Sequence, residues 1–459
     1  MLRKVSKIIN IVVVAATVLL LGVQTTSAQA LTLEQCRQMA LDSNYKLKSS
    51  SEKILASEDL LKAYKTNNLP NFSLGGNYLY SSMSYSLAMA GGYLPIFTNG
   101  VMSSDTFAYM PDQNYELEVG SVFNVSAMAT QPIYMGGQVS NAIKLARVGV
   151  KVSNLERQLS QTEVLELVDN AFYKVVELEE LLLSAQKYEA VVEEFHTQME
   201  SAYNRGMKTR NDLLKVGVRL SEAKLMTQKA TNGLRLATMN LCYTIGLPLS
   251  TAEVSLSSSN IEQGQQINDN SLDVTSRPEY AMLEEQIIAK ELEVKITRGG
   301  YLPSLSAVAS YGYANGVKIN GATALNGTSF MGGVSLNVPI FHWGEGRRKT
   351  SAKQREVTMA QNQMADMKQL MSLELLQAIN TYNESLLEVS LAQESVTQAE
   401  ENMRLSKSHY DAGMETIADY LESQALWQKA MSDLCAARAG QRTSYTSYLK
   451  CRGELLVVE

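Results

Sequence analysis

The chain is poor in the residues that usually build metal and disulfide sites. It has three histidines and four cysteines among 459 residues. The histidines are His196, His342 and His409, and they are too far apart in sequence to show a metal-ligand spacing. The cysteines are Cys36, Cys242, Cys435 and Cys451, with no Cys-x-x-Cys pair. We therefore expect no metal site and no cofactor, while disulfides and buried free thiols are both open for the cysteines.

The chain also lacks a surplus of positive charge. It has 41 Lys and Arg against 47 Asp and Glu, a formal net charge of −6. Binding of nucleic-acid phosphates requires clustered Lys and Arg, so this balance excludes nucleic acid as an expected partner. No pairing of a nucleophile with a base stands out either, and we do not expect an enzyme.

Long hydrophobic runs are scarce, and the one near the start extends from Ile8 to Val23. Three basic residues precede it, and an Ala-x-Ala sequence ending at Ala30 follows, which is the layout of a secretory signal peptide. The alternative is a transmembrane anchor, but roughly 16 residues fall short of the ~20 that a spanning helix needs. We expect cleavage after Ala30 and export of the remainder.

What the sequence does contain is a long-period repeat. The segment QPIYMGG at residues 131–137 recurs as VPIFHWG at 338–344, and YNRG at 203–206 recurs as YDAG at 410–413. Each pair is 207 residues apart. A Leu-Pro pair at 69–70 recurs at 302–303, so the first copy carries about 26 extra residues before its Pro-Ile motif. The repeat predicts one architecture with internal pseudo-symmetry.

Hydrophobic periodicity predicts long helices and short strand pairs in each copy. Helical spacing covers residues 31–65, 137–203, 210–245, 346–410 and 415–450. The long segments are followed by return segments, which predicts antiparallel coiled-coil hairpins. Alternating patterns predict four strands, near 72–80, 123–127, 305–313 and 334–340. The part between Tyr80 and Tyr115 is expected to be an exposed loop.

Each of the four predicted strands has one apolar and one polar face, which suits a transmembrane barrel. Four strands cannot close a barrel, because an open edge in lipid leaves backbone groups unpaired at several kcal/mol each. About eight strands is the smallest barrel observed. We therefore expect the chain to complete its barrel with copies of itself.

Taken in order, these motifs resemble the TolC-like outer membrane efflux protein family. The resemblance is carried by the opening Leu-Thr-Leu at 31–33, the Leu-Pro strand entries, the Pro-Ile-aromatic strand exits, Arg-Pro-Glu at 277–279 and the Tyr-x-x-Gly turns. It covers essentially all of the mature sequence. It implies a homotrimer with a twelve-stranded barrel in outer-membrane lipid and a helical tunnel in the periplasm. It also implies a periplasmic adaptor protein and an inner-membrane pump as partners.

The resemblance further implies where the functional residues lie. Hairpin turns and adaptor contacts correspond to Tyr203, Gly206, Tyr410 and Gly413. The pore gate corresponds to Asp419, Glu422 and, in the first copy, Asp212. Because Asp419 and Glu422 are three residues apart, they lie on one helix face. Threefold symmetry would form rings of three carboxylates, which favour cations and tend to raise carboxyl pKa values.

Glu415 departs from the family pattern, because some relatives have an arginine there that ties neighbouring hairpins together. Two interpretations are open. A closing ion pair could run in the opposite sense, from Glu415 to Lys208 or Arg210 of the other copy. In the other interpretation, Glu415 is a solvated residue in the first turn of its helix.

The predicted organisation is a signal peptide at 1–30, a first repeat at 31–246, a linker at 247–276 and a second repeat at 277–459. The predicted fold class is mainly α with a small membrane β part. The expected function is that of an outer-membrane export duct that passes small toxic molecules or drugs from a pump and adaptor to the exterior. The alternatives are the exit channel of a type I protein secretion system and a structural coiled-coil protein of the envelope.

Overall fold

The computed structural model describes residues 30–98, 101–249, 256, 264–268 and 271–456. They fall into two compact units. We call the first the hairpin unit; it takes the described parts of Met1–Lys53, Ser153–Met282 and Met364–Glu459. We call the second the strand unit; it takes those of Ile54–Val152 and Leu283–Gln363. Each unit combines segments of both predicted repeats, whose boundaries stay predictions, and the predicted signal peptide lies outside the described residues.

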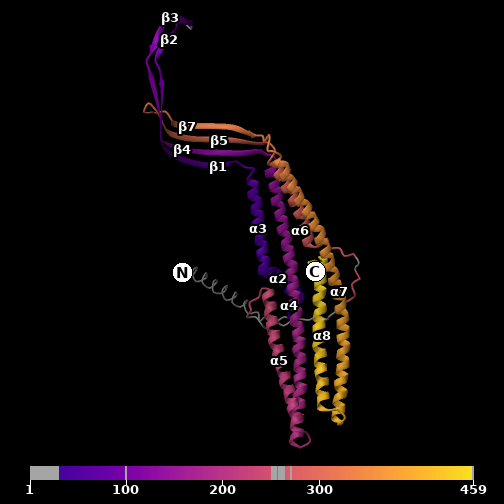
Figure 1. Ribbon diagram of the computed structural model, residues 1–459. Helices are drawn as coiled ribbons and strands as arrows, with labels where there is room; N and C mark the ends of the chain where they lie inside the picture. Colours follow the sequence, from indigo (N-terminus) through magenta and orange to yellow (C-terminus); the bar gives the residue numbers. More distant parts are fainter. Residues whose placement is uncertain (1–29, 99–100, 250–255, 257–263, 269–270, 457–459) are drawn as a thin grey trace, which may run out of the picture. The chain divides into compact units, whose positions relative to one another are not determined.

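Long helices dominate the chain (Figure 1). They are α2 (Leu33–Ser43), α3 (Tyr45–Thr66), α4 (Gln138–Asn204), α5 (Arg210–Thr244), α6 (Pro278–Gly299), α7 (Glu345–Asp411) and α8 (Ile417–Arg452). Helices α4 and α7 have 67 residues each, as the uninterrupted periodicity predicted. Helix α6 begins at Pro278 with Glu279 in its first turn, so the Arg-Pro-Glu motif at 277–279 marks a helix start. None of the described helices has both the length and the apolarity needed to cross a bilayer.

The first predicted helix is wrong in one respect, because the chain forms two helices, α2 and α3, instead of one. Asn44 separates them with an extended backbone, φ −64° and ψ 129°. Its side-chain Nδ2 donates to the Thr244 carbonyl at 3.1 Å, and its Oδ1 accepts from the Lys46 amide at 2.8 Å. An asparagine side chain that bonds nearby backbone competes with helix continuation. The hydrophobic spacing did not show this local competition.

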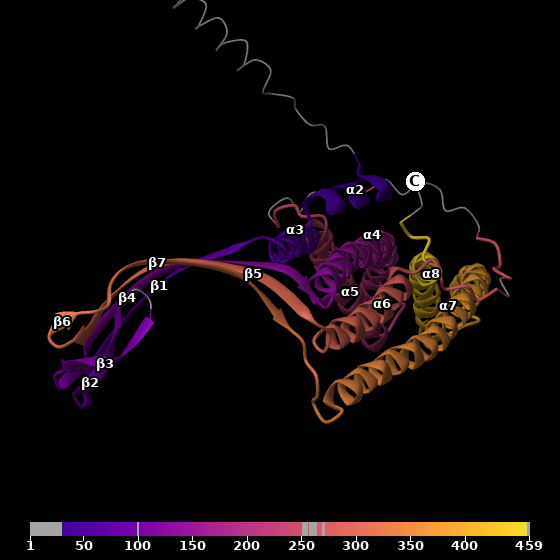
Figure 2. The same ribbon diagram turned by 90° about the horizontal axis from the view of Figure 1, so that it is seen from above.

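Helices α4 and α5 form one antiparallel hairpin, and α7 and α8 form the other; both views show each pair side by side (Figures 1 and 2). Val192 of α4 packs with Ala223 of α5, and both are almost completely buried. Val396 of α7 packs with Ala430 of α8 in the same way. These apolar seams confirm the predicted helical hairpins.

A buried ion pair joins the first helix to the rest of the hairpin unit. The guanidinium of Arg37 on α2 donates to both carboxylate oxygens of Asp169 on α4, at 2.8 and 2.5 Å. The Asp169 side chain is completely buried, and it also accepts from the Thr446 hydroxyl of α8 at 2.7 Å. A buried carboxylate needs this full set of partners to offset its lost hydration.

The four cysteines are free thiols, and all four are buried in the hairpin unit. Burial raises the pKa of the Cys36, Cys435 and Cys451 thiols to about 11. At neutral pH these side chains are therefore protonated and poorly reactive.

The strand unit holds an antiparallel sheet in the order β1-β4-β5, with β7 and the short β6 both paired to β5. Two further strands, β2 and β3, pair with each other. The strands are β1 (Asn71–Met89), β2 (Gly92–Thr98), β3 (Val101–Met110), β4 (Gln113–Met135), β5 (Ser304–Ile319), β6 (Ala322–Thr323) and β7 (Asn326–Asn337). The predicted loop between Tyr80 and Tyr115 is wrong, because strands occupy nearly all of it. The last predicted strand is too long, since β7 ends at Asn337 before Pro339, whose nitrogen cannot donate to a ladder.

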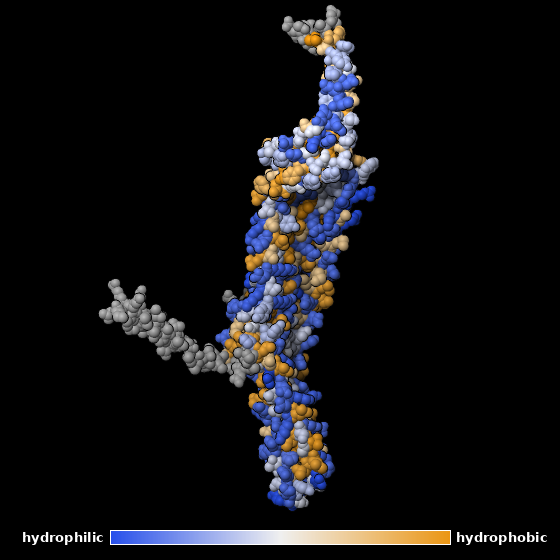
Figure 3. Space-filling view, turned by 90° about the vertical axis from the view of Figure 1, so that its left-hand side faces the viewer, coloured by the Kyte–Doolittle hydropathy of each residue, from blue (hydrophilic) through white to orange (hydrophobic). Residues whose placement is uncertain are grey.

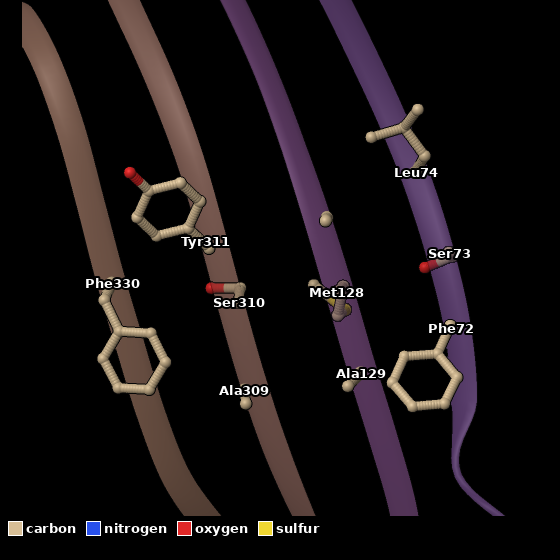
Figure 4. Close-up of a pocket in the computed structure, with 10 residues that line it drawn as sticks. Phe72, Ser73, Leu74, Met128, Ala129, Ala309, Ser310, Tyr311 and Phe330 are labelled. Carbon is tan, nitrogen blue, oxygen red and sulfur yellow. The ribbon is translucent and has the colours of Figure 1, made fainter.

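The alternation predicted for the strands is confirmed by their register. Phe72 of β1 is opposite Ala129 of β4, and Ala129 is opposite Ala309 of β5. One step along, Leu74, Ala127, Tyr311 and Phe330 follow one another across β1, β4, β5 and β7. Figure 4 shows Phe72, Leu74, Tyr311 and Phe330 on these strands, around a shallow hollow that is also lined by Met128 and by small residues such as Ala129 and Ala309. Directly opposed residues share a face, so this side of the sheet is largely apolar, with Thr328, Asn315 and Asn326 as polar residues on it.

Candidate functional site at the hairpin ends

Both hairpins end in the same backbone turn. The Gly206 amide donates to the Tyr203 carbonyl at 2.8 Å, and the next amide donates to Ala202 at 2.9 Å. In the second hairpin, the Gly413 amide donates to the Tyr410 carbonyl at 3.0 Å, and the Met414 amide donates to the His409 carbonyl at 2.8 Å. Gly206 and Gly413 have φ values of +76° and +74°. This left-handed helix ending is favourable for glycine, which explains why each Tyr-x-x-Gly motif places glycine at its fourth position.

Both return helices also begin in the same way. Thr209 caps α5 by accepting from the Asp212 amide at 3.2 Å, and Asp212 accepts back from the Thr209 amide at 3.4 Å. Thr416 caps α8 by accepting from the Asp419 amide at 3.3 Å, and Asp419 accepts back from the Thr416 amide at 3.0 Å. These are reciprocal capping boxes. The sequence carries their signal as Thr-x-x-Asp at both positions, which the sequence analysis missed.

The three acids predicted for the gate are therefore placed at defined positions. Asp419 and Glu422 are both exposed on α8, about one helical turn apart. Asp212 is partly exposed at the equivalent place on α5. The hydroxyl and the backbone amide of Thr416 lower the pKa of the Asp419 carboxyl below its ordinary value. Within one protomer, then, the capping contacts favour the ionised form of Asp419.

An aromatic cluster connects the two hairpins just above their ends. The ring of Phe195 on α4 lies 5.5 Å from Tyr410 on α7 and 5.0 Å from Tyr420 on α8, edge to face in both cases. Lys208 lies in the turn that connects α4 to α5, and its ammonium is 4.6 Å from the centre of the Tyr410 ring. Cation–π contacts of this kind stabilise by about 0.5–1 kcal/mol at exposed sites. Phe195 and Tyr420 were not among the predicted site residues, although both fall on the buried seam of their helices.

Glu415 has partners other than those predicted. The Ser406 hydroxyl donates to it, and its Oε1 lies 3.1 Å from His409 Nδ1. These two hydrogen bonds lower its pKa. Glu415 precedes the Thr416 cap and therefore lies outside the first helical turn, where the second interpretation placed it, while 30% of its side chain is exposed. No ion pair found among the described residues of this protomer joins Glu415 to Lys208 or Arg210, and a pairing between protomers stays a prediction.

The ends of the hairpins are hydrophilic over most of the face seen in Figure 3. Together, the duplicated turns, the capped helix starts and the exposed acids describe the periplasm-directed end of a helical duct. The strand unit, with one apolar face on four long strands, describes one part of a membrane-spanning wall. The class of protein that combines both is the outer-membrane channel with an attached helical tunnel.

Comparison with known proteins identifies the family. Residues 36–246 and 274–449 match the model of the family described as "Outer membrane efflux protein". The outer membrane protein TolC of Escherichia coli K12 is 21% identical over 425 residues, which cover 90% of this chain and 80% of TolC. The pyoverdine export outer membrane protein OpmQ of Pseudomonas aeruginosa is 23% identical over 312 residues, covering 66% of this chain and 64% of OpmQ.

Solved structures agree with this result. The Campylobacter jejuni CmeC outer membrane channel superposes with a TM-score of 0.71 at 17% identity, covering 92% of this chain and 86% of CmeC. The chain belongs to the outer membrane efflux protein family. It is an outer-membrane export channel, mainly helical with a smaller strand part. Its helices form the periplasmic tunnel.

Proposed function

We propose that this channel exports small toxic molecules or drugs, and that Asp419 and Glu422 form its periplasmic gate. The observation that carries the gate is their position. Both carboxylates are exposed at the start of α8, one turn apart, on a helix end that the chain builds twice with the same cap. OpmQ, whose name assigns it to pyoverdine export, supports a small-molecule cargo.

Threefold symmetry turns each acid into a ring of three carboxylates. At separations near ~7 Å, each like-charge pair interacts by roughly 0.6–2.4 kcal/mol, depending on screening. Such rings attract cations and repel anions at the narrow end of a tunnel. In the first copy, Asp212 supplies the corresponding charge beside the pore and has a supporting role in the proposed gate.

We place the adaptor contact at the two turns that hold Tyr203, Gly206, Tyr410 and Gly413. These turns have the same backbone hydrogen bonds, so they present an equivalent shape twice in each protomer. A partner with pseudo-repeated binding surfaces could then dock on both hairpin ends in the same orientation. An inner-membrane pump joined through a periplasmic adaptor completes the proposed system.

The closing contact in this proposal is between Lys208 and the ring of Tyr410. It links the turn of one hairpin to the end of the other within the protomer. Replacing Lys208 with alanine should raise the conductance of the resting channel. Arg210→Ala is the matched control for a lost positive charge two residues away, and it should have a smaller effect unless Arg210 pairs with Glu415 of a neighbouring protomer.

The gate is tested by conductance of the purified trimer in planar lipid bilayers. The double variant Asp419→Asn/Glu422→Gln removes the charges and preserves side-chain size and one acceptor oxygen on each side chain. We expect a small, cation-selective conductance in the wild type, and a larger conductance with weaker selectivity in the double variant.

The capping role of Asp419 requires its own control. Thr416→Ala removes the capping hydroxyl and leaves both acids charged, so it should preserve cation selectivity. Equal loss of selectivity in Thr416→Ala and the double variant would assign the effect to helix structure and overturn the charge gate. Unchanged conductance in the double variant would place the gate elsewhere.

A further inference from the structure

The outer part of the first strand pair has two sharply different faces. We call residues 83–98 and 101–119 the first-repeat extension. In its β1 and β4 strands, the pairs Met83–Val119, Tyr85–Leu117 and Leu87–Tyr115 lie directly opposite each other. The intervening pairs Ser84–Glu118 and Ser86–Glu116 lie on the other face. Met83, Tyr85 and Leu87 have 54%, 59% and 64% of their surface exposed. Such a continuous exposed apolar face indicates contact with another apolar surface.

This apolar face is the continuation of the apolar face of the transmembrane sheet. Between Tyr80 and Met83 the β1–β4 register shifts, with one more residue on β1 than on β4. The extra residue brings the odd-numbered Met83 and Tyr85 onto the face that holds the even-numbered Phe72 and Tyr78. On β4, Val119 and Leu117 keep the odd numbering of Val125 and Ala127. Across the register shift, the apolar residues of β1 and β4 therefore stay on the same side of the sheet.

Three neighbouring strands are irregular at this one level of the sheet. The β4–β5 register also shifts, between Val119 and Phe123. On β5, Gly316 has a φ of +131°, and a Cβ there would lie 2.0 Å from the Ser121 carbonyl oxygen. Bulges bend a sheet and increase its twist. In Figure 1 the strands change direction between the main sheet and β2–β3, and both parts belong to the strand unit.

The membrane-spanning part of β1 is complete before this level. A tilted transmembrane strand needs about 9–11 residues, and Phe72 to Tyr80 already supplies about nine. Strand β1 has 19 residues and β4 has 23, whereas β7 has 12. The apolar face therefore continues well beyond the residues that the hydrocarbon core requires.

Another protomer's strand edge does not account for this surplus. Barrel closure places the β1 edge of one protomer beside the β7 edge of the next. Strand β7 pairs with β5 only as far as Asn315–Asn326, and Asn315 is opposite Phe123, at the level of the irregularity. Within this protomer's own ladder, the β7 edge therefore ends at the level at which the extension begins.

We propose that the first-repeat extension lies along the outer leaflet of the membrane, with its apolar face in contact with lipid. In this proposal the bend turns the apolar face toward the bilayer, so that Met83, Tyr85, Leu87 and Tyr115 enter the interfacial region. The opposite face, with Ser86, Glu116 and Glu118, faces water. The ligand is thus a lipid surface, bound by an amphipathic sheet in the way that amphipathic helices bind one.

Site-directed spin labelling of the trimer in lipid vesicles tests this placement. Leu87→Cys and Ser86→Cys are a matched pair, adjacent on β1 and on opposite faces. The native cysteines are buried, so the new thiols are the preferred sites for labelling. Leu74→Cys, on the transmembrane part of the same face, gives the reference for lipid contact. The measurement is the collision rate of each label with oxygen, which concentrates in lipid, and with a water-soluble nickel chelate.

We expect the oxygen-to-nickel ratio at position 87 to approach that at 74 and to exceed that at 86 several-fold. Equal, high nickel accessibility at 86 and 87 would show that the extension stands in water and would overturn the proposal. Protection of position 87 from both reagents would also overturn it, because another protein surface would then cover this face. Tyr115→Cys and Glu116→Cys on β4 repeat the comparison, so the result does not depend on a single pair of variants.

Discussion

The two repeats are most alike at the hairpin ends and least alike at the outer end of the strands. At the hairpin ends the turns and the caps match hydrogen bond for hydrogen bond. At the outer end, the first repeat continues into a bent, amphipathic extension, whereas the second connects β5 to β7 through the two-residue β6 and a short turn. The two repeats are therefore alike at their hairpin ends and different at their outer strand ends.

The physical reason lies in what each end must satisfy. A helix end must find partners for its free backbone groups, and few residue combinations do so in a tight turn. A strand pair beyond the membrane already has its backbone bonds in the ladder, so its length is less constrained. In the proposed trimer, the hairpin ends also meet around the pore axis, where the proposed gate acts.

The largest expected effect is on the free energy of unfolding, and it should differ between the buried arginines of the two repeats. Arg37→Met removes the guanidinium that pairs with Asp169, whose side chain is completely buried, and should lower the free energy of unfolding by about 3–5 kcal/mol. Arg277→Met removes a buried cation whose partners Glu374 and Glu279 are 52% and 24% exposed, so water can replace much of both contacts and the cost should be about 1 kcal/mol. Guanidinium unfolding in detergent measures both. Equal losses of unfolding free energy in the two variants would show that burial of the partner carboxylate does not determine the loss.

A smaller effect should be the same in both copies. Gly206→Ala and Gly413→Ala force alanine into a left-handed backbone at a cost of about 1–2 kcal/mol each. No atom lies within 4 Å of the added Cβ at either position, so the penalty is conformational in both. Local amide hydrogen exchange at the hairpin ends measures it. A clear difference between the two variants would break the equivalence of the turns.

The smallest expected effect concerns pH. Thr416 lowers the pKa of Asp419, so the folded state favours the carboxylate. Its stabilising contribution is present above the pKa of the unfolded chain and is lost only as pH falls through the lower folded pKa. Repulsion within the proposed carboxylate rings acts on the wild type and on Thr416→Ala alike, so the difference between the two reports the Thr416 contacts. In Thr416→Ala, cation selectivity should be lost at a higher pH than in the wild type. Loss of selectivity at the same pH in both proteins would contradict this assignment.

Much of this architecture could be predicted from the sequence because its signals are periodic. Helices of 67 residues and the alternating strands leave patterns many residues long, and the 207-residue spacing placed the turns and acids at equivalent positions. Local competition was harder to predict. Asn44 breaks the first helix through hydrogen bonds to Thr244 and Lys46, and the first of these partners is 200 residues away.

The extension was misread as a loop because its strands carry serines, methionines and glycines, which have weak individual strand preferences. Its alternation becomes clear only when Tyr85 and Leu117 are seen opposite each other. In the site, Asp212 and Asp419 were expected by resemblance alone, and their capping contacts supply a structural reason for the same residues. Phe195 and Tyr420 could not be predicted as a cluster, since they come from different hairpins.

The contacts of Asp169 also tie the two ends of the described chain to one buried group. Its carboxylate accepts from Arg37 of the first described helix and from Thr446 of the last, 132 residues before it and 277 after it. Contacts this distant in sequence slow folding, because the entropy of closing the intervening chain opposes them. Full pairing of this buried carboxylate therefore requires nearly the whole described chain.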